Sequence, residues 1–567
     1  MLSRVPLIPR CLPVPNLPQL RHRVEHRVRI AGVARWCSAF LSDFSPFSED
    51  LIQQKCDWKK PVCDVCKNST LPLGDCEYPE GRFSQADILQ EKISILETRL
   101  EELQTPSSAS GSLRLTDPWA KNQTTSSGSS ASSKPKNGAR ILNDFQSGPP
   151  ERRRSILDTF LKHSSEVGFF LEPTQFTSAF LSSGNDQQPT LTLVSIVLLF
   201  NVYFEGSGTS ESQEAEHFVY ATESHSRLAF SGSHPKVVLY TIQANVLLAH
   251  YLLLKGKALE GKYYLVGAVS LVLSTGLHRT RTSDPTRSRA ATFLPAPRDA
   301  IGEGERINAV WAVVALNACW TTAERHASNL DYNSVDGRID APWPMDIARY
   351  AKNSFPTDFR TSHTIQKFLT NQSDEGYSTL ALYAKASILF EQASALYYQY
   401  RPNMDSTEAR RYSFSCDNLN SLLARFTSEL RPPEAAKSLD IQRRLLVVHL
   451  LSKVASIQLH YAFVASNASS YAQVLSTANS VVEMLKTVDL KAFEVVDPIV
   501  AILLKVVGKV FIAEIANARS SRNEIGGFIA SYKCIIDAMS VLGAGRCTLM
   551  EKEAALLREK YTSVVSR

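Results

Sequence analysis

Four cysteines lie close together near the start of this chain. Cys56, Cys63, Cys66 and Cys76 fall within 21 residues, spaced C-x6-C-x2-C-x9-C. Thiolates suit zinc, and a pair two residues apart, such as Cys63 and Cys66, can bind one ion from a single turn. No apolar signal-peptide core precedes them, so we expect a reducing compartment, where such a cluster more often binds metal than forms disulfides. The sequence therefore predicts a Zn²⁺ site held by these four thiols.

The other residue types that can do chemistry are dispersed. Gly256 to Lys262 begins like a phosphate-binding loop, but Tyr263 stands where magnesium requires a hydroxyl from Ser or Thr, so we interpret it as the turn of a helical hairpin. We expect no enzyme. The remaining cysteines are expected to be buried small side chains or inert thiols, and three histidines to pack or cap helices: Cys11, Cys37, Cys319, Cys416, Cys534, Cys547, His250, His278 and His326.

A short helix with a heptad seam follows the cysteines. Residues 84–104 carry apolar side chains spaced four, three, four and three apart, which predicts a coiled coil that joins two copies of the chain. Two heptads are fewer than a confident coiled coil needs, so an amphipathic helix packed on its own chain remains the alternative. The seam consists of Leu89, Ile93, Leu96, Leu100 and Leu103.

Composition divides the 567 residues into segments. The formal charge is +6, and residues 1–60 hold seven Arg and three Lys against five acids, so +5 of it lies there. Residues 1–52 are rich in Arg and Pro and are expected to be disordered; a mitochondrial transit peptide is the alternative. The longest apolar runs, 191–204 and 237–254, are too short or too interrupted to cross a bilayer, so no membrane protein is expected.

A serine-rich linker and a large helical body make up the rest. Residues 105–140 are rich in Ser and hold almost no bulky apolar side chains, so 105–150 is expected to be a disordered linker. From 151 onward apolar residues recur at helical spacing, which predicts an all-helical body divided into 151–365 and 366–567. The expected helices are 155–167 with Ser155 as N-cap, 190–204, a hairpin of 237–254 and 259–274 ending at Gly276, then 307–322, 380–400, 417–430, 440–465, 472–488, 498–518 and 524–542.

The cysteine segment resembles a known family. Residues 55–79 read KCDWKKPVCDVCKNSTLPLGDCEYP, with Pro61 in the six-residue loop and Tyr78 after the final thiol. This is similar to the second half of the fungal binuclear zinc cluster of transcription regulators. Residues 53–80 would then be a partial zinc-cluster DNA-binding domain, followed by a coiled coil, a linker and a helical body in that family's order.

The body adds a weaker resemblance to the middle homology region of the same regulators. It involves Gly276, Leu277 and His278 after the hairpin, then Arg306 and Trp311, then IDAPWP at 339–344. With it the similarity extends over roughly 53–350. The resemblance implies a regulatory role for 151–365, responding to an effector molecule that the sequence does not identify.

The chain departs from the family where the first half of the cluster should be. The first two ligands would fall at positions occupied by Pro46 and Glu49, and the basic run before the third ligand is DLIQQK, which retains only Lys55. The resemblance leaves Lys55, Lys59 and Lys60 to contact DNA. Because phosphate affinity needs several Lys or Arg, we expect weak, non-specific, salt-sensitive binding from this chain.

Three explanations fit this departure: a transcript lacking the proper first exon, a natural variant that binds metal but not DNA, or a decayed cluster. We favour the first, because the similarity begins abruptly near Gln53. The sequence thus predicts a nuclear, zinc-dependent regulator that binds double-stranded DNA if its cluster is complete and forms a homodimer. The alternative is a dimerisation partner that does not touch DNA.

Overall fold

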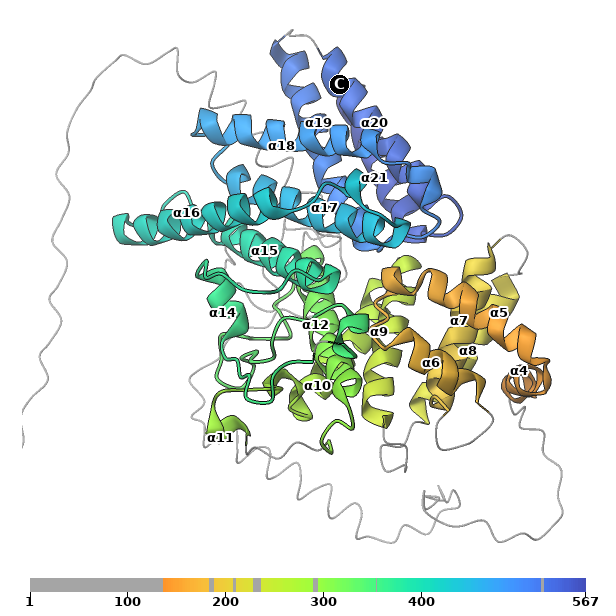
Figure 1. Ribbon diagram of the computed structural model, residues 1–567. Helices are drawn as coiled ribbons and strands as arrows, with labels where there is room; N and C mark the ends of the chain where they lie inside the picture. The colour runs from red at the N-terminus through yellow and green to blue at the C-terminus, as the bar shows by residue number, and fades with distance from the viewer. Residues whose placement is uncertain are drawn as a thin grey trace, which may run out of the picture. The chain divides into compact units, whose positions relative to one another are not determined.

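The computed structural model describes residues 136–182, 188–206, 211–227, 236–288, 294–352, 354–521 and 525–566. Helices account for 73% of them, and none of them lies in a strand, so the predicted all-α body is confirmed. They belong to one compact unit, which includes 135–567 (Figure 1). The predicted segments 1–52, 53–80 and 84–104 lie outside the described residues, as does the linker up to 135.

The first helices of the body precede a long loop region. Their order is α4 (Lys136–Ser147), α5 (Pro150–Lys162), η2 (Ser164–Val167), α6 (Pro173–Leu181), α7 (Leu191–Glu205), α8 (Glu211–Ser226), α9 (Val237–Leu254), α10 (Ala258–Ser274), η4 (Leu277–Arg279), α11 (Pro285–Ser288) and α12 (Ala300–Ala323).

Helices α9 and α10 form the predicted hairpin. Gly256 has φ 67° in the turn and Gly276 has φ 73° after α10, and left-handed backbone of this kind favours glycine. By length and composition α9 could cross a membrane, but 94% of it is buried inside the body. Burial on all sides explains why α9 is apolar all round, as in a core helix.

The remaining helices follow the loop region. They are α13 (Ile347–Tyr350), α14 (Thr364–Leu369), α15 (Thr379–Gln399), α16 (Ser406–Glu429), η5 (Pro433–Ala435), α17 (Leu439–Tyr461), α18 (Ala468–Thr487), η6 (Leu490–Ala492), α19 (Ile499–Ser521), α20 (Gly526–Gly543) and α21 (Thr548–Val565).

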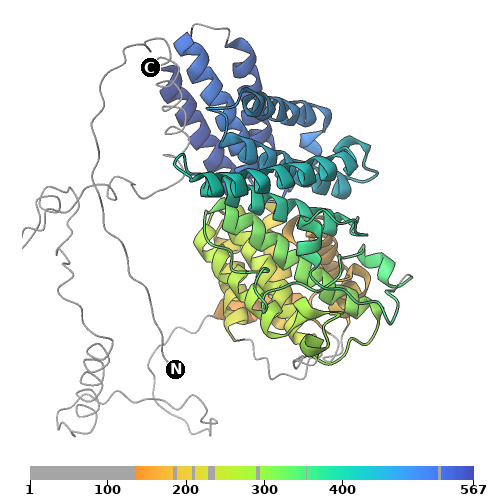
Figure 2. The ribbon, with the colours of Figure 1, turned by 90° about the vertical axis from the view of Figure 1, so that its left-hand side faces the viewer.

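Helix α15 lies at the middle of the body. It packs against α12 on one side and α17 on the other, so it joins the earlier helices to the later ones (Figures 1 and 2). Beyond α17, the helices α19, α20 and α21 pack against one another. The predicted boundary between 365 and 366 falls inside α14.

Two predictions near the start of the body were wrong. Ser155 is not an N-cap, because α5 already begins at Pro150, where proline fits the first turn of a helix. The linker was predicted to extend to 150, but residues 136–147 form α4. The ring of Phe145 in α4 packs edge-on against that of Phe180 in α6, with the ring centroids 5.3 Å apart. The polar composition of this segment gave no indication of this apolar contact.

Candidate functional site

The residues predicted to bind zinc, DNA and a second chain all lie outside the described residues. They are Cys56, Cys63, Cys66, Cys76, Lys55, Lys59, Lys60, Leu89, Ile93, Leu96, Leu100 and Leu103. Among the residues that the structure does describe, no group of His, Cys, Asp and Glu is arranged to hold a metal ion. The zinc site therefore stays a prediction from the sequence.

The cysteines of the body are structural. Cys319, Cys416 and Cys547 are buried, and Cys534 is half-buried. Burial raises the pKa of the Cys319 thiol to about 12 and that of Cys547 to about 11. Thiols of this kind stay protonated at neutral pH and are poor nucleophiles, as expected from their scattered positions.

The three histidines singled out from the sequence have packing or capping positions. His250 is 3% exposed, and its ring nitrogen lies 2.9 Å from the Val246 carbonyl oxygen. His278 is 1% exposed. His326 has an exposed ring, and its backbone N–H donates to Thr321 O at 2.9 Å, which caps the end of α12. The prediction that these residues pack or cap is confirmed.

Segments that carried the second resemblance meet in the core. The carbonyl of His278 in η4 accepts hydrogen bonds from Asp340 N at 2.9 Å and from Ala341 N at 3.1 Å. The His278 ring nitrogens lie 3.3 Å from Val272 O and 3.0 Å from Asp336 O. Burial lowers the pKa of His278 to about 4. The IDAPWP segment is thus held against the end of the hairpin.

Two tryptophans hold the other end of IDAPWP. Trp311 of α12 is fully buried, and its indole N–H donates to Pro342 O at 2.6 Å. The rings of Trp311 and Trp343 stack with centroids 4.1 Å apart. Arg306, which the resemblance also included, is not part of this arrangement, because it bonds Pro295 O instead.

A buried lysine lies against the second tryptophan. Lys385 of α15 is 5% exposed, and its ammonium lies 4.9, 5.4 and 5.6 Å from the ring centroids of Trp343, Phe368 and Tyr377. It donates to Gly376 O at 2.9 Å and to the Asp374 carboxylate. Burial lowers the pKa of Lys385, and Asp374 opposes that shift.

Asp340 anchors the same segment through charge. It is fully buried and contacts Arg338 Nε at 2.9 Å and Arg287 Nη1 at 3.5 Å, while Thr282 Oγ1 donates to it at 2.8 Å. Burial alone would raise its pKa, but these groups and the backbone N–H of His363 hold the pKa of Asp340 below its usual value. The carboxylate is therefore ionised and fully enclosed by donors.

Sequence reasoning missed Lys385, Arg287 and Arg338. The only signal was the acid in IDAPWP, because a buried Asp requires a cationic partner. Nothing in the sequence indicated which of the many arginines would supply it. Lys385 lies in an apolar helix, where a single charge gives no indication of an aromatic enclosure.

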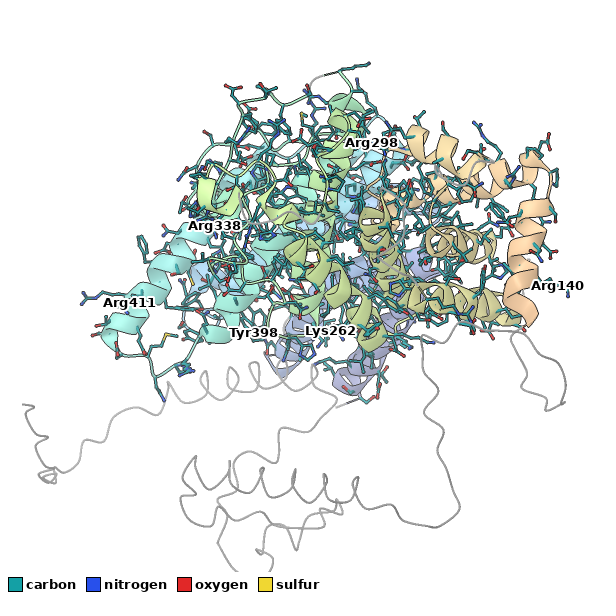
Figure 3. All side chains as sticks on the ribbon, turned by 90° about the horizontal axis from the view of Figure 1, so that it is seen from below. Arg140, Lys262, Arg298, Arg338, Tyr398 and Arg411 are labelled. Carbon is teal, nitrogen blue, oxygen red and sulfur yellow. The ribbon has the colours of Figure 1, made fainter. Side chains whose placement is uncertain are left out.

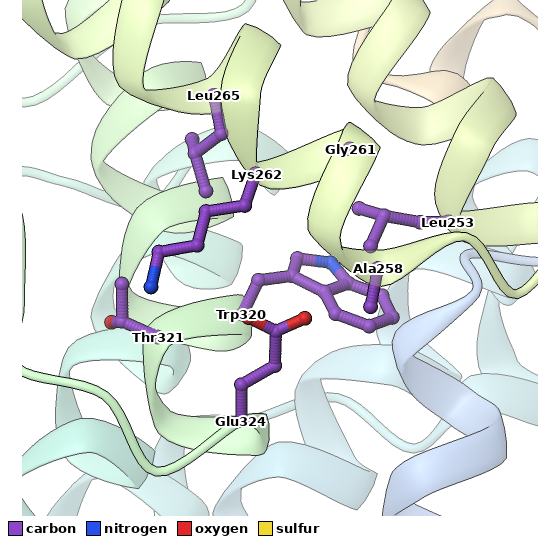
Figure 4. A pocket seen from close by; sticks show the side chains of 8 residues that line it. All are labelled: Leu253, Ala258, Gly261, Lys262, Leu265, Trp320, Thr321 and Glu324. Carbon is purple, nitrogen blue, oxygen red and sulfur yellow. The ribbon is translucent and has the colours of Figure 1, made fainter. Parts of the chain in front are cut away.

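A narrow pocket lies elsewhere in the body, between α10 and the end of α12 (Figure 4). Its walls are Leu253, Ala258, Gly261, Lys262, Leu265, Trp320, Thr321 and Glu324. Arg338 and Lys262 lie apart in Figure 3, so this pocket and the Asp340 cluster are separate sites. Lys262 and Glu324 place one charge of each sign at its rim, but the side chains around it leave no room for a water molecule inside.

Comparison with known proteins gives no family: neither a family model nor a curated protein sequence matches this chain.

Proposed function

We propose that the chain is a nuclear transcription regulator of the fungal zinc-cluster type whose own contact with DNA is incomplete. The observation that carries the proposal is the spacing of four thiols at Cys56, Cys63, Cys66 and Cys76, within the segment similar to that family. Four thiolates can close a tetrahedral zinc site. The protein would act by binding rather than by catalysis.

The body lends support from its packing. Segments that resemble the middle homology region lie far apart in sequence, yet His278 and Trp311 both contact the IDAPWP residues. The middle homology resemblance rests on these same residues. We expect this region to transmit the effect of a bound effector to the regulator.

Metal analysis of the purified full chain tests the zinc site. We expect one zinc per chain by elemental analysis, lost in the double variant Cys63→Ser, Cys66→Ser. The matched control is Cys534→Ser, a half-buried thiol of the body that should leave the zinc content unchanged. A chain purified without zinc, or one in which the double variant keeps its metal, would rule out the site.

DNA binding should be weak as the chain stands. In residues 50–55, where the family carries its basic run, only Lys55 is basic, so few DNA phosphates can be neutralised. A gel shift with the full chain should show non-specific binding that disappears as salt increases. Tight, sequence-selective binding would contradict the expectation that the missing thiols and basic residues weaken contact with DNA.

The same missing run favours a second candidate function. Without base contacts, the chain would act as a dimerisation partner that captures intact family members through 84–104. A pull-down against a full-length regulator of the family distinguishes the two candidate functions. It compares the unchanged chain with a variant in which the charges of Glu91 and Glu101 are reversed. Loss of capture with unchanged zinc content would favour the partner role.

Nuclear localisation follows from the regulator proposal and is checked with a fluorescent tag at the C-terminus. The Arg-rich residues 1–42 contain a single acid, Glu25, and would favour mitochondria if they acted as a transit peptide. Mitochondrial fluorescence would contradict a nuclear regulator. Nuclear fluorescence would exclude the transit peptide.

A further inference from the structure

Helix α10 carries an apolar stripe on its outer face. The helix packs on α9 and α12 with its buried residues. On the other side Leu259 is 78% exposed, Tyr263 71% and Val266 41%. Residues 263–274 contain no charged side chain, whereas the outer face of a surface helix is normally polar. An apolar stripe of this kind is suited to contact with another protein surface.

The stripe has the spacing of a coiled-coil seam. Its positions lie four, three, four and three residues apart along the helix: Leu259, Tyr263, Val266, Ser270 and Leu273. Ser270 is exposed and Leu273 is half-buried, so the seam extends over the length of α10. Because a heptad pattern keeps its residues in line along a second helix, the element that fits this face is a helix with a matching seam.

The stripe is complementary to itself when two copies of α10 run antiparallel. The two charged residues of α10, Glu260 and Lys262, both lie in its first half. In an antiparallel pair they meet the uncharged second half of the other copy, whereas a parallel pair would place like charges side by side, which is unfavourable. The large Tyr263 side chain also lies against this second half, where Ser270 is small.

We propose that the outer face of α10 is a surface for self-association, on which the α10 helices of two copies of the chain pack antiparallel about a two-fold axis. Such an interface is isologous, so each copy contributes the same residues to it. The contact involves neither zinc nor DNA and lies outside 84–104. Its failure would therefore leave the proposed regulator function untouched.

The interface is small. A helix of 17 residues is about 25 Å long and about 10 Å wide. Stable protein interfaces bury about 1,200–2,000 Å², and a single pair of helices of this length buries less. We therefore expect a weak dimer in exchange with the monomer, with a dissociation constant in the micromolar range.

Photo-crosslinking of the full chain shows what covers the stripe. p-Benzoylphenylalanine takes the place of Tyr263, and isotope-labelled and unlabelled chains are mixed before illumination at about 100 µM, where a micromolar dimer is populated. We expect cross-linked peptides that join position 263 of one isotopic form to residues 259–274 of the other. The same photoreactive residue in place of Phe414, which is 67% exposed on α16, is the control and should give no such peptides.

Sedimentation velocity measures the strength of the contact. All chains carry Leu96→Asp, which breaks the predicted seam of 84–104, so that only the body can associate. Leu259→Glu together with Tyr263→Glu should raise the dissociation constant of the dimer at least about tenfold, because carboxylates would be buried in an apolar contact. The matched control, Val335→Glu with Phe414→Glu, adds the same charge at positions 75% and 67% exposed and should leave the constant unchanged. Thermal melting shows whether each variant is folded.

The proposal is overturned if the folded chain with the broken seam stays monomeric at the concentration of the cross-linking experiment. It is also overturned if the folded Leu259→Glu, Tyr263→Glu variant dimerises as tightly as its control. Cross-links confined to chains of one isotopic form, including any to residues 84–104, would mean that another part of the same chain covers the stripe. None of these outcomes bears on the zinc cluster, which the metal analysis tests separately.

Discussion

Individual buried charges help to fix the position of IDAPWP. Asp340 is enclosed by Arg338 and Arg287, whereas Asp336, four residues earlier, is 97% exposed and lies 3.6 Å from Arg279. Removing one partner of a buried ion pair leaves the other charge uncompensated, while an exposed pair contributes little. These two aspartates therefore form a matched comparison.

Asp340→Asn should lower the free energy of unfolding by about 3–5 kcal/mol, because the buried Arg287 loses its carboxylate partner and Arg338 keeps only Asp284. The control Asp336→Asn should change it by less than about 1 kcal/mol. Denaturant unfolding of both variants checks the difference. Equal effects would mean that the charge of Asp340 does not hold the segment.

The buried His278 gives a pH dependence of stability. Folding lowers the pKa of His278 from 6.5 to about 4. Between these two pH values the imidazole is protonated in the unfolded chain and neutral in the folded chain. Stability from this group is complete above pH 6.5 and is lost as the pH falls toward 4, by up to about 3 kcal/mol. His278→Gln should make the free energy of unfolding fall less steeply as the pH drops through this window. Burial also lowers the pKa of His163 and His250, which account for the slope that remains. Denaturant unfolding at several pH values between 4 and 7 checks this.

At the scale of elements, the sequence located helices better than it located their starts. The hairpin of α9 and α10 was predicted almost to the residue, because its turn contains Gly256 and its end contains Gly276. Helix α16 was predicted from 417, but it begins at Ser406. Its first turns are mostly polar and exposed, so apolar periodicity does not reveal them.

The signal that could have found the start of α16 is its cap. The carboxylate of Asp405 accepts from Thr407 N and Glu408 N at 2.7 and 2.8 Å. Similar caps, Asp299 before α12 and Asn467 before α18, begin those helices earlier than predicted. Helices α6, α8 and α21 were missed because they are short or have broad polar faces. The contacts of the candidate sites join distant segments, so no local pattern could predict them.

Asp405→Ala should fray the start of α16 and lower stability by about 1 kcal/mol, because two backbone N–H groups lose their acceptor. Hydrogen exchange should speed up over residues 406–410 and stay unchanged in α17. Asp417→Ala, an exposed position inside the same helix, is the control. Unchanged exchange at the start of α16 in Asp405→Ala would show that the cap does not hold it.

At the scale of the molecule, polar contacts tie the beginning of the body to its end. Glu166 of η2 is fully buried and lies 3.2 Å from Arg443 Nε of α17. The neighbouring Arg444 lies 3.7 Å from Asp497, to which Tyr383 of α15 donates at 2.9 Å. Together with the packing of α15 between α12 and α17, these contacts favour a body that unfolds as a whole.

Trp311→Ala tests that cooperativity. Removing a fully buried tryptophan should cost about 3–5 kcal/mol by leaving a cavity beside Trp343. If the body is one cooperative unit, the slowest-exchanging amides of α9 and of α19 should both exchange faster by the same factor. Helix α9 is one of the earlier helices, like α12 with Trp311, whereas α19 is one of the later helices. If α9 loses its protection from hydrogen exchange while α19 keeps it, the body consists of two parts that unfold separately, with the boundary between α12 and α15. Local opening would then be limited to the part that contains the cavity.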